Sequence, residues 1–120
     1  MSKYRGRHTS SYILLLLAEQ ESYGGALMNR LQTELPHCFS DSADIYRSLG
    51  ELEKDGSVVS RWETPDTGQP RKWYSVTEKG LRSLADHADD IQKRMENFAF
   101  FQTHYNILTA QSTDTHGGKS

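Results

Sequence analysis

The sequence is poor in the residues that most often mark covalent or metal chemistry. It contains a single cysteine, Cys38, which cannot form an internal disulfide and so favours a reducing, cytoplasmic setting. No CxxC or HxxxH spacing occurs and the histidines are scattered, whereas a structural zinc site needs four convergent ligands. Gly-rich phosphate loops, GxSxG and HExxH are absent from the sequence too. We therefore expect no metal, no cofactor and no enzymatic activity.

Long apolar runs are missing as well. The longest, from Tyr12 to Ala18, has 7 residues, whereas a membrane span needs about 20, and no small-residue cleavage site follows it. We expect neither a transmembrane nor an exported protein. With only 3 prolines and 9 glycines among 120 residues, and 35% hydrophobic residues, the composition is that of one ordinary globular domain.

Net charge is also small, at −2, which alone argues against a nucleic-acid partner. The charges are unevenly spread, however. Residues 1–8 carry Lys3, Arg5 and Arg7 with no acid, and residues 57–76 carry a second group of cations, Arg61, Arg71 and Lys72. These groups are either a solubilising arm and a solvated turn, or contacts for phosphate.

Hydrophobic periodicity predicts three helices in the first half of the chain. The first runs from about residue 10 to Glu19, capped by Thr9, Ser10 or Ser11, and the second ends at Pro36. A third helix, capped by Asp41 or Ser42 and stopped by Gly56, has a core stripe formed by Ile45, Leu49 and Leu52.

In the second half of the chain, apolar and polar residues first alternate and then recur at helical spacing. Residues 57–64 and 71–76 predict the two strands of a β-hairpin, and Thr77 caps a last helix. The apolar residues of this helix recur at spacings of three and four, which is typical of a dimerisation seam: Leu81, Leu84, Ala88, Ile91, Met95 and Phe98, with Phe101 after a shortened step. We expect the helix to end at residue 109 and residues 110–120 to be a disordered tail.

Three helices followed by a hairpin is the order of a winged helix-turn-helix. The sequence therefore predicts a mainly α (α+β) fold. It consists of a flexible basic arm at residues 1–8, a winged helix-turn-helix DNA-binding domain at 9–76 and a C-terminal dimerisation helix at 77–109.

Three blocks of sequence resemble the PadR family of bacterial transcriptional regulators. They are Ile45-Tyr-Arg-Ser-Leu-Gly-Glu-Leu-Glu-Lys-Asp-Gly56, Val59-Ser-Arg-Trp-Glu63 and Gly68-Gln-Pro-Arg-Lys-Trp-Tyr-Ser-Val-Thr-Glu-Lys-Gly80. They are similar to the family's "LYRxLxxLExxGLV" recognition helix, its Gly-x-Pro-Arg wing turn and its "YxLTxxG". The resemblance covers roughly residues 9 to 100 and implies a homodimeric repressor on a palindromic operator. Gly25, Gly50 and Glu51 depart from the family's pattern.

The resemblance implies that Tyr46 and Arg47 contact double-stranded DNA, the arginine by pairing with guanine and the tyrosine by reaching phosphate. The plainer interpretation makes Tyr46 half-buried and Arg47 solvated, and pairs the wing cations with Glu63 or Asp66. The expected DNA contacts are Lys3, Arg5, Arg7, Ser40, Ser42, Asp44, Tyr46, Arg47, Arg61, Arg71 and Lys72. The expected dimer contacts are Leu84, Ala88, Ile91, Met95, Phe98 and Phe101.

Two other functions stay open at this point. The acidic third helix suits a winged-helix module that contacts protein and lacks strong DNA affinity. The other alternative is an enzyme, which no catalytic motif in the sequence supports. Some PadR relatives bind planar aromatic effectors between the dimer helices. Here the aromatic residues of the last helix and Trp73 are either such a pocket or ordinary packing: Phe98, Phe100, Phe101 and Tyr105.

Overall fold

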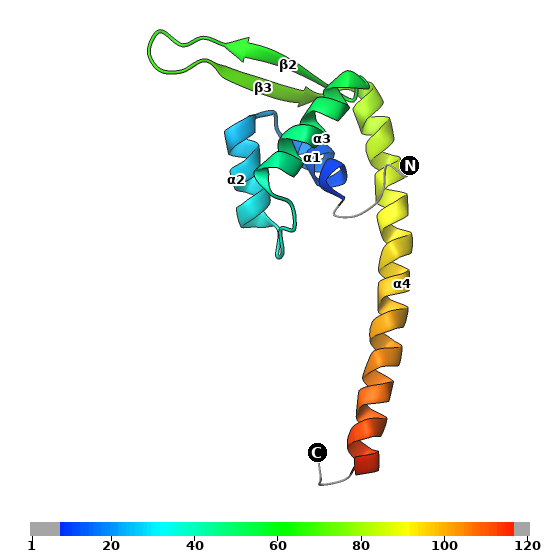
Figure 1. Cartoon of the computed structure of the whole chain (residues 1–120). Helices are drawn as coiled ribbons and strands as arrows, with labels where there is room; N and C mark the ends of the chain where they lie inside the picture. Colours follow the sequence, from blue (N-terminus) through cyan, green and yellow to red (C-terminus); the bar gives the residue numbers. More distant parts are fainter. Residues whose placement is uncertain (1–7, 117–120) are drawn as a thin grey trace. The chain divides into compact units, whose positions relative to one another are not determined.

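The computed structural model describes residues 8–116 and has the predicted order of elements plus one short strand (Figure 1). The elements are α1 (Thr9–Glu19), β1 (Ser22–Tyr23), α2 (Gly24–Glu34), α3 (Ser42–Lys54), β2 (Val58–Glu63), β3 (Arg71–Val76) and α4 (Glu78–His116). The chain forms two compact units, one ending at Ala88 and the other beginning at Asp89. The first unit is a winged helix-turn-helix, as the sequence predicts.

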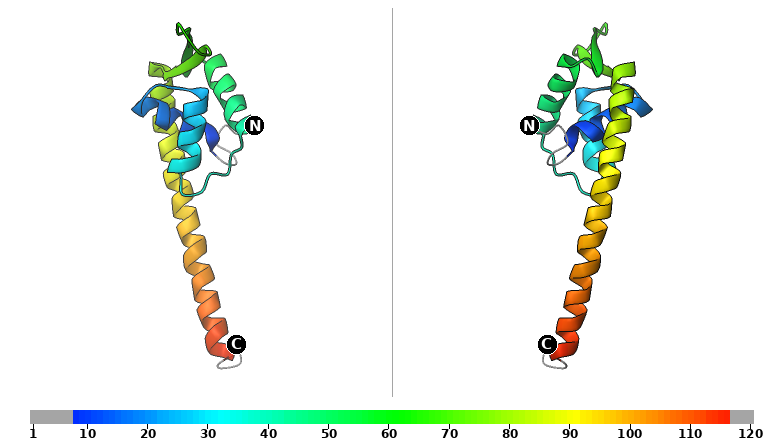
Figure 2. Two further views of the ribbon diagram at one scale, coloured as in Figure 1. Left: turned by 90° about the vertical axis from the view of Figure 1, so that its left-hand side faces the viewer. Right: turned by 90° about the vertical axis from the view of Figure 1, so that its right-hand side faces the viewer.

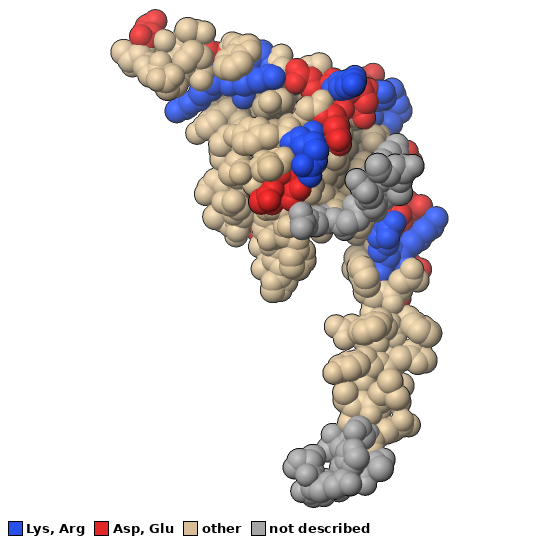
Figure 3. Space-filling model, viewed as in Figure 1, with Lys and Arg blue, Asp and Glu red and all other residues tan. Residues whose placement is uncertain are grey.

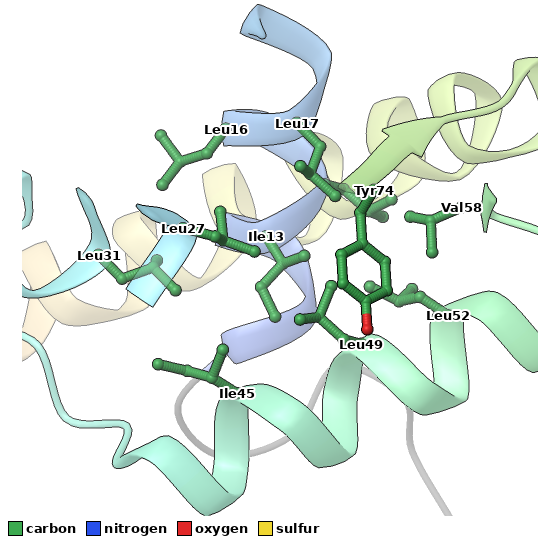
Figure 4. Packing of buried hydrophobic residues seen from close by; sticks show 11 residues of the cluster. Ile13, Leu16, Leu17, Leu27, Leu31, Ile45, Leu49, Leu52, Val58 and Tyr74 are labelled. Atoms are coloured by element: carbon green, nitrogen blue, oxygen red, sulfur yellow. The ribbon is translucent and has the colours of Figure 1, made fainter. Parts of the chain in front are cut away.

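The core of the first unit joins all three short helices to the sheet (Figure 4). The predicted stripe on α3 is confirmed, since Ile45 and Leu49 are fully buried and Leu52 is nearly so. They pack in one cluster with residues of α1, α2 and the sheet: Ile13, Leu14, Leu16, Leu17, Leu27, Leu31, Val58 and Tyr74. Burying one such aliphatic side chain contributes about 1.5–3 kcal/mol, so this cluster is the main source of stability for the unit.

The two ends of α3 are fixed by local chemistry that the sequence predicts. Asp41 caps the helix by accepting the Asp44 backbone N–H at 2.8 Å, and the Asp44 carboxylate in turn accepts the Asp41 N–H at 3.1 Å. This capping box satisfies two backbone donors that the helix leaves without partners. Gly56 follows the helix with a φ of 86°, the left-handed conformation that glycine adopts without strain.

The start of α1 differs from the prediction. No side chain caps this helix, and the residue before it, His8, has a φ of 58°. The predicted capping residue Thr9 is already helical, and its hydroxyl lies 2.5 Å from that of Ser40. The hydroxyl therefore ties α1 to the loop before α3 and does not close the end of its own helix.

The three strands form an antiparallel sheet in the order β1-β3-β2. The hairpin of β2 and β3 is confirmed, and its register pairs Arg61 with Trp73 and Trp62 with Lys72. The sequence did not predict β1, where Tyr23 pairs with Trp73.

The β3 strand leads directly into α4, which Thr77 caps as predicted by accepting the Gly80 N–H at 3.1 Å. At Gly80 the helix passes so close to the sheet that an added Cβ would lie 2.6 Å from Val76 Cγ2 and closer still to the Ser57 carbonyl oxygen. Only glycine fits this contact between backbones.

The helix α4 has 39 residues, and Figure 2 shows it as one continuous helix. It extends to His116, so residues 110–116 are helical where the sequence predicts the start of a disordered tail. Leu84 packs against the core of the first unit. In the second unit the side chains of Met95, Phe98 and Phe101 are 57–65% exposed in the single chain. Among the described residues, no helix is long and apolar enough to cross a membrane.

Candidate nucleic-acid interface

The helix α3 has one buried and one exposed side, which follows from its 3.6-residue period. The exposed side is a single row opposite the core stripe, formed by Ala43, Tyr46, Arg47, Gly50 and Lys54. An added Cβ at Gly50 would have nothing within 4 Å, so the middle of this row is open. An exposed helix face of this kind is what a winged helix presents to the major groove.

Arg47 stands on this row next to an acidic partner. Its Nη2 lies 2.5 Å from Asp44 Oδ1, and its side chain is 62% exposed while that of Asp44 is only 13% exposed. Of these two predicted DNA contacts, the structure therefore places Arg47 outward and places Asp44 beneath it.

Tyr46 projects from the same row toward the start of α2. Its ring covers Gly24 so closely that an added Cβ there would lie 2.9 Å from Cε1 and 3.0 Å from the hydroxyl oxygen. The tyrosine is still 48% exposed. It is thus both packed and accessible, which combines the two interpretations that the sequence left open.

A cleft of about 350 Å³ separates α2 and α3 from the wing. Its lining brings together three predicted DNA contacts, Tyr46, Arg71 and Lys72. It also contains residues that the sequence analysis did not assign to the site: Tyr23, Gly24, Gly25, Trp62, Pro70 and Tyr74. A surface of this kind combines cations with aromatic faces, both of which bind nucleic acid.

Arg61 does not share this cleft, although the sequence grouped it with Arg71 and Lys72. Its register partner Trp73 lies on the face of the sheet away from α3, and Arg61 pairs there with Glu21 at 3.2 Å and covers the Trp73 ring at 5.5 Å. Alternation along a strand separates neighbouring side chains onto opposite faces. Arg71 reaches the cleft from the Arg61 side, with its guanidinium 4.6 Å from the centre of the Tyr23 ring.

Lys72 connects the wing to α3 through Glu53. Its Nζ is 3.4 Å from Glu53 Oε1, and Ser60 of β2 donates to Glu53 Oε2 at 2.5 Å. The Ser60 hydrogen bond, helped by Lys72, lowers the pKa of Glu53 in spite of partial burial. Burial lowers the pKa of Lys72, but Tyr74 and Glu53 together outweigh it and raise the pKa. The predicted pairing of wing cations with Glu63 or Asp66 is replaced, for Lys72, by this link to α3.

Of the remaining predicted DNA contacts, one is exposed, one is bonded within the protein and three lie outside the described residues. Ser42 is exposed in the first turn of α3, whereas Ser40 is half-buried and bonded to Thr9. Lys3, Arg5 and Arg7 lie outside the described residues. Lys54 was not predicted as a contact, although its position one turn after Gly50 in the 3.6 period would have placed it on the exposed row.

Basic and acidic side chains alternate over α3 in Figure 3, and the wing carries basic side chains along the edge facing α2. The acids on α3 are therefore not a uniformly repulsive surface, since Asp44 and Glu53 are each paired with a cation. Within the part of the chain that the structure describes, no group of three His, Cys, Asp or Glu residues could hold a metal ion.

The comparison with known families decides what kind of protein carries this interface. The PadR-like family of transcriptional regulators matches residues 13–86, which is the core of the winged-helix unit. The chain belongs to this family. PadR-like proteins are transcription regulators and not enzymes, so this chain is a regulator of the DNA-binding kind.

Solved structures agree with this assignment in fold. A PadR family transcription regulator from Clostridium difficile is 21% identical, with a TM-score of 0.65 over 77% of this chain and 98% of that one. A transcriptional regulator from Clostridium thermocellum is 22% identical, with a TM-score of 0.67 over 78% and 89%. The circadian clock associated protein Pex from Anabaena is 29% identical, with a TM-score of 0.57 over 79% and 80%. No curated protein matches this chain.

Proposed function

We propose that this PadR-like regulator is a homodimeric repressor that binds a palindromic operator in double-stranded DNA, in the cytoplasm. The observation that carries the proposal is the exposed row on α3, with Tyr46 and Arg47 beside a cleft that also contains Arg71 and Lys72. The row would enter the major groove, and the two wing cations would hold the adjacent phosphate backbone.

The need for a dimer follows from the small number of cations on this surface. Arg47, Arg71, Lys72 and Lys54 are few, and two of them are already paired with acids. Two copies would double the phosphate contacts, and a two-fold axis between them calls for a palindromic site with half-sites about 34–36 Å apart or a multiple of that.

The second unit supports association between copies. Its exposed apolar side chains include Met95, Phe98, Phe101, Tyr105 and Leu108, which fall along one side of the helix. Such a row on a single helix of this length is stable in water when a partner covers it. Phe100 lies roughly 200° around the helix from Phe98 and stacks on His104 with a centroid distance of 4.0 Å, so it belongs to another side.

Binding to the promoter region beside the protein's own gene tests the proposal. We expect log K to fall linearly with log salt, because each phosphate contact releases counterions. Arg47→Ala should reduce binding, while Arg82→Ala, an exposed arginine of α4 outside the row and cleft, is the matched control. A reporter gene driven by the same promoter tests repression, and its output should fall when the protein is expressed.

The alternative, a protein-interaction module, predicts no salt-dependent DNA binding. Two of the acidic residues that suggested it, Asp44 and Glu53, are paired with cations, which weakens that alternative. A planar aromatic effector remains part of the proposal, since Phe101 and Tyr105 are exposed and stack with a centroid distance of 6.1 Å. Quenching of aromatic fluorescence by an added ligand, with release of DNA, would demonstrate it.

A further inference from the structure

The carboxylate of Asp44 is held in one orientation. Its Oδ2 accepts the backbone N–H of Asp41 at 3.1 Å, as part of the capping box. Its Oδ1 lies 2.5 Å from Arg47 Nη2. Because one oxygen is fixed to the backbone at the helix start, the other occupies a defined position beneath the exposed row of α3.

This geometry restricts Arg47 at one end of its guanidinium. An arginine has five N–H donors in a planar fork, and the contact with Asp44 engages donors on Nη2 only. Nη2 carries two N–H groups, so the contact with Asp44 leaves its second N–H and the donors of Nη1 and Nε available for a base edge. A long side chain on an exposed helix face otherwise has many rotamers, which it must give up when it binds.

The nearby negative charge also affects where Arg47 can bind. A carboxylate 13% exposed, next to the DNA-facing row, repels phosphate groups and attracts the guanidinium. A released arginine would turn to the phosphate backbone, which carries no sequence information. The pair therefore weakens sequence-independent attraction and favours contact with bases.

We propose that Asp44 is a positioning residue that gives Arg47 its sequence discrimination. It holds the guanidinium ready for the edge of a guanine and keeps it from the phosphates. The proposal rests on the proposed DNA-binding function, and it adds a residue that does not itself need to touch DNA.

Selection from a randomised duplex library tests this, followed by Kd measurements on the selected duplex and its single-base-pair variants. In Asp44→Asn the amide oxygen still accepts the Asp41 N–H, so the cap is kept while the charge is lost. Asp44→Ser, with a hydroxyl acceptor, is a second uncharged variant. The matched control is Asp41→Asn, which removes one charge from the same turn and leaves the contact with Arg47 in place.

We expect both Asp44 variants to lose discrimination at one base pair in each half-site by about 2- to 12-fold, the equivalent of ordering one flexible side chain. Their binding to unrelated duplexes should be tighter than that of the wild type. Asp41→Asn should keep the wild-type profile. In an Arg47→Ala background, Asp44→Asn should leave the base profile unchanged.

Three results would overturn the proposal. They are an unchanged base profile in folded Asp44 variants, an equal change in Asp41→Asn, or a change from Asp44→Asn that persists without Arg47. Thermal melting of each variant identifies loss of folding. If the wild-type protein selects no sequence at all, the proposed function fails together with this inference, which is a different outcome from the first three.

Discussion

Two glycine-to-alanine substitutions in helices should change stability in opposite directions. Gly80 and Gly50 both have helical neighbours, but an added Cβ at Gly80 meets Val76 and the Ser57 carbonyl, whereas at Gly50 it meets nothing within 4 Å. Helix propensity alone favours alanine at both positions by up to about 1 kcal/mol. The surroundings alone therefore decide the sign.

The free-energy cost of an alanine at Gly80 depends on the contacts that the start of α4 would lose. The Ser57 carbonyl accepts the Thr77 N–H and the Thr77 hydroxyl, each at 3.0 Å. If α4 moves away from Ser57, these two bonds are lost, at about 0.5–1.5 kcal/mol each. If it stays, crowding costs about 1–3 kcal/mol. After the gain in helix propensity is subtracted from the middle of either range, we expect Gly80→Ala to lower the free energy of unfolding by about 1–2 kcal/mol.

Thermal unfolding followed by circular dichroism measures both variants. With about 4–8 °C of melting temperature per kcal/mol for a domain of this size, Gly80→Ala should melt roughly 4–16 °C below the wild type. Gly50→Ala should melt about 2–8 °C above it, because it gains about 0.5–1 kcal/mol without contact. A Gly80→Ala protein as stable as the wild type would refute the close approach, and a destabilised Gly50→Ala would refute the open space on α3.

Three further outcomes are expected. Arg71→Ala should weaken binding to all DNA sequences and reduce the slope of log K against log salt by roughly 1. An unchanged slope would mean that Arg71 of the wing does not contact the DNA phosphates. Ile91→Glu should cost several kcal/mol of dimer stability and abolish operator binding; sedimentation of a folded, dimeric variant would contradict this. Because the pKa of Glu53 is lowered in the folded protein, its carboxylate stabilises the fold above the ordinary glutamate pKa and loses this effect as pH falls. Wild type and Glu53→Gln should therefore converge in stability in acid, and a constant difference would argue against the link to Ser60 and Lys72.

The sequence predicted the parts of the fold that depend on repetition. Periodic burial found the core stripe of α3 and the hairpin, and local capping chemistry found Asp41, Gly56 and Thr77. It missed β1, because two residues are too few for a pattern. It also ended α4 too early, since Ser and Thr are common in loops, whereas a helix once formed adds one hydrogen bond per residue.

The site was predicted less completely, because its arrangement depends on contacts between elements. Arg71 and Lys72 alternate along β3 and yet both line the cleft, whereas Arg61 lies beside Trp73 and outside it. Nothing local to α3 indicates that Lys72 pairs with Glu53, or that the Tyr46 ring lies over Gly24. Such contacts join segments far apart in the chain, and a single sequence contains no periodic signal for them.

The bonds from Glu53 to Ser60 and Lys72 have a consequence for the base-pair spacing of the operator. They join α3, which we propose reads bases, to the hairpin, which we propose holds the phosphate backbone, so the distance between the two contacts on DNA is fixed. Inserting one base pair between their footprints displaces one of them by about 3.4 Å and roughly 35° around the helix axis. The ion pair and the hydrogen bond through Glu53 would oppose that displacement. Natural operators should therefore vary in the spacing between half-sites before they vary in spacing within one.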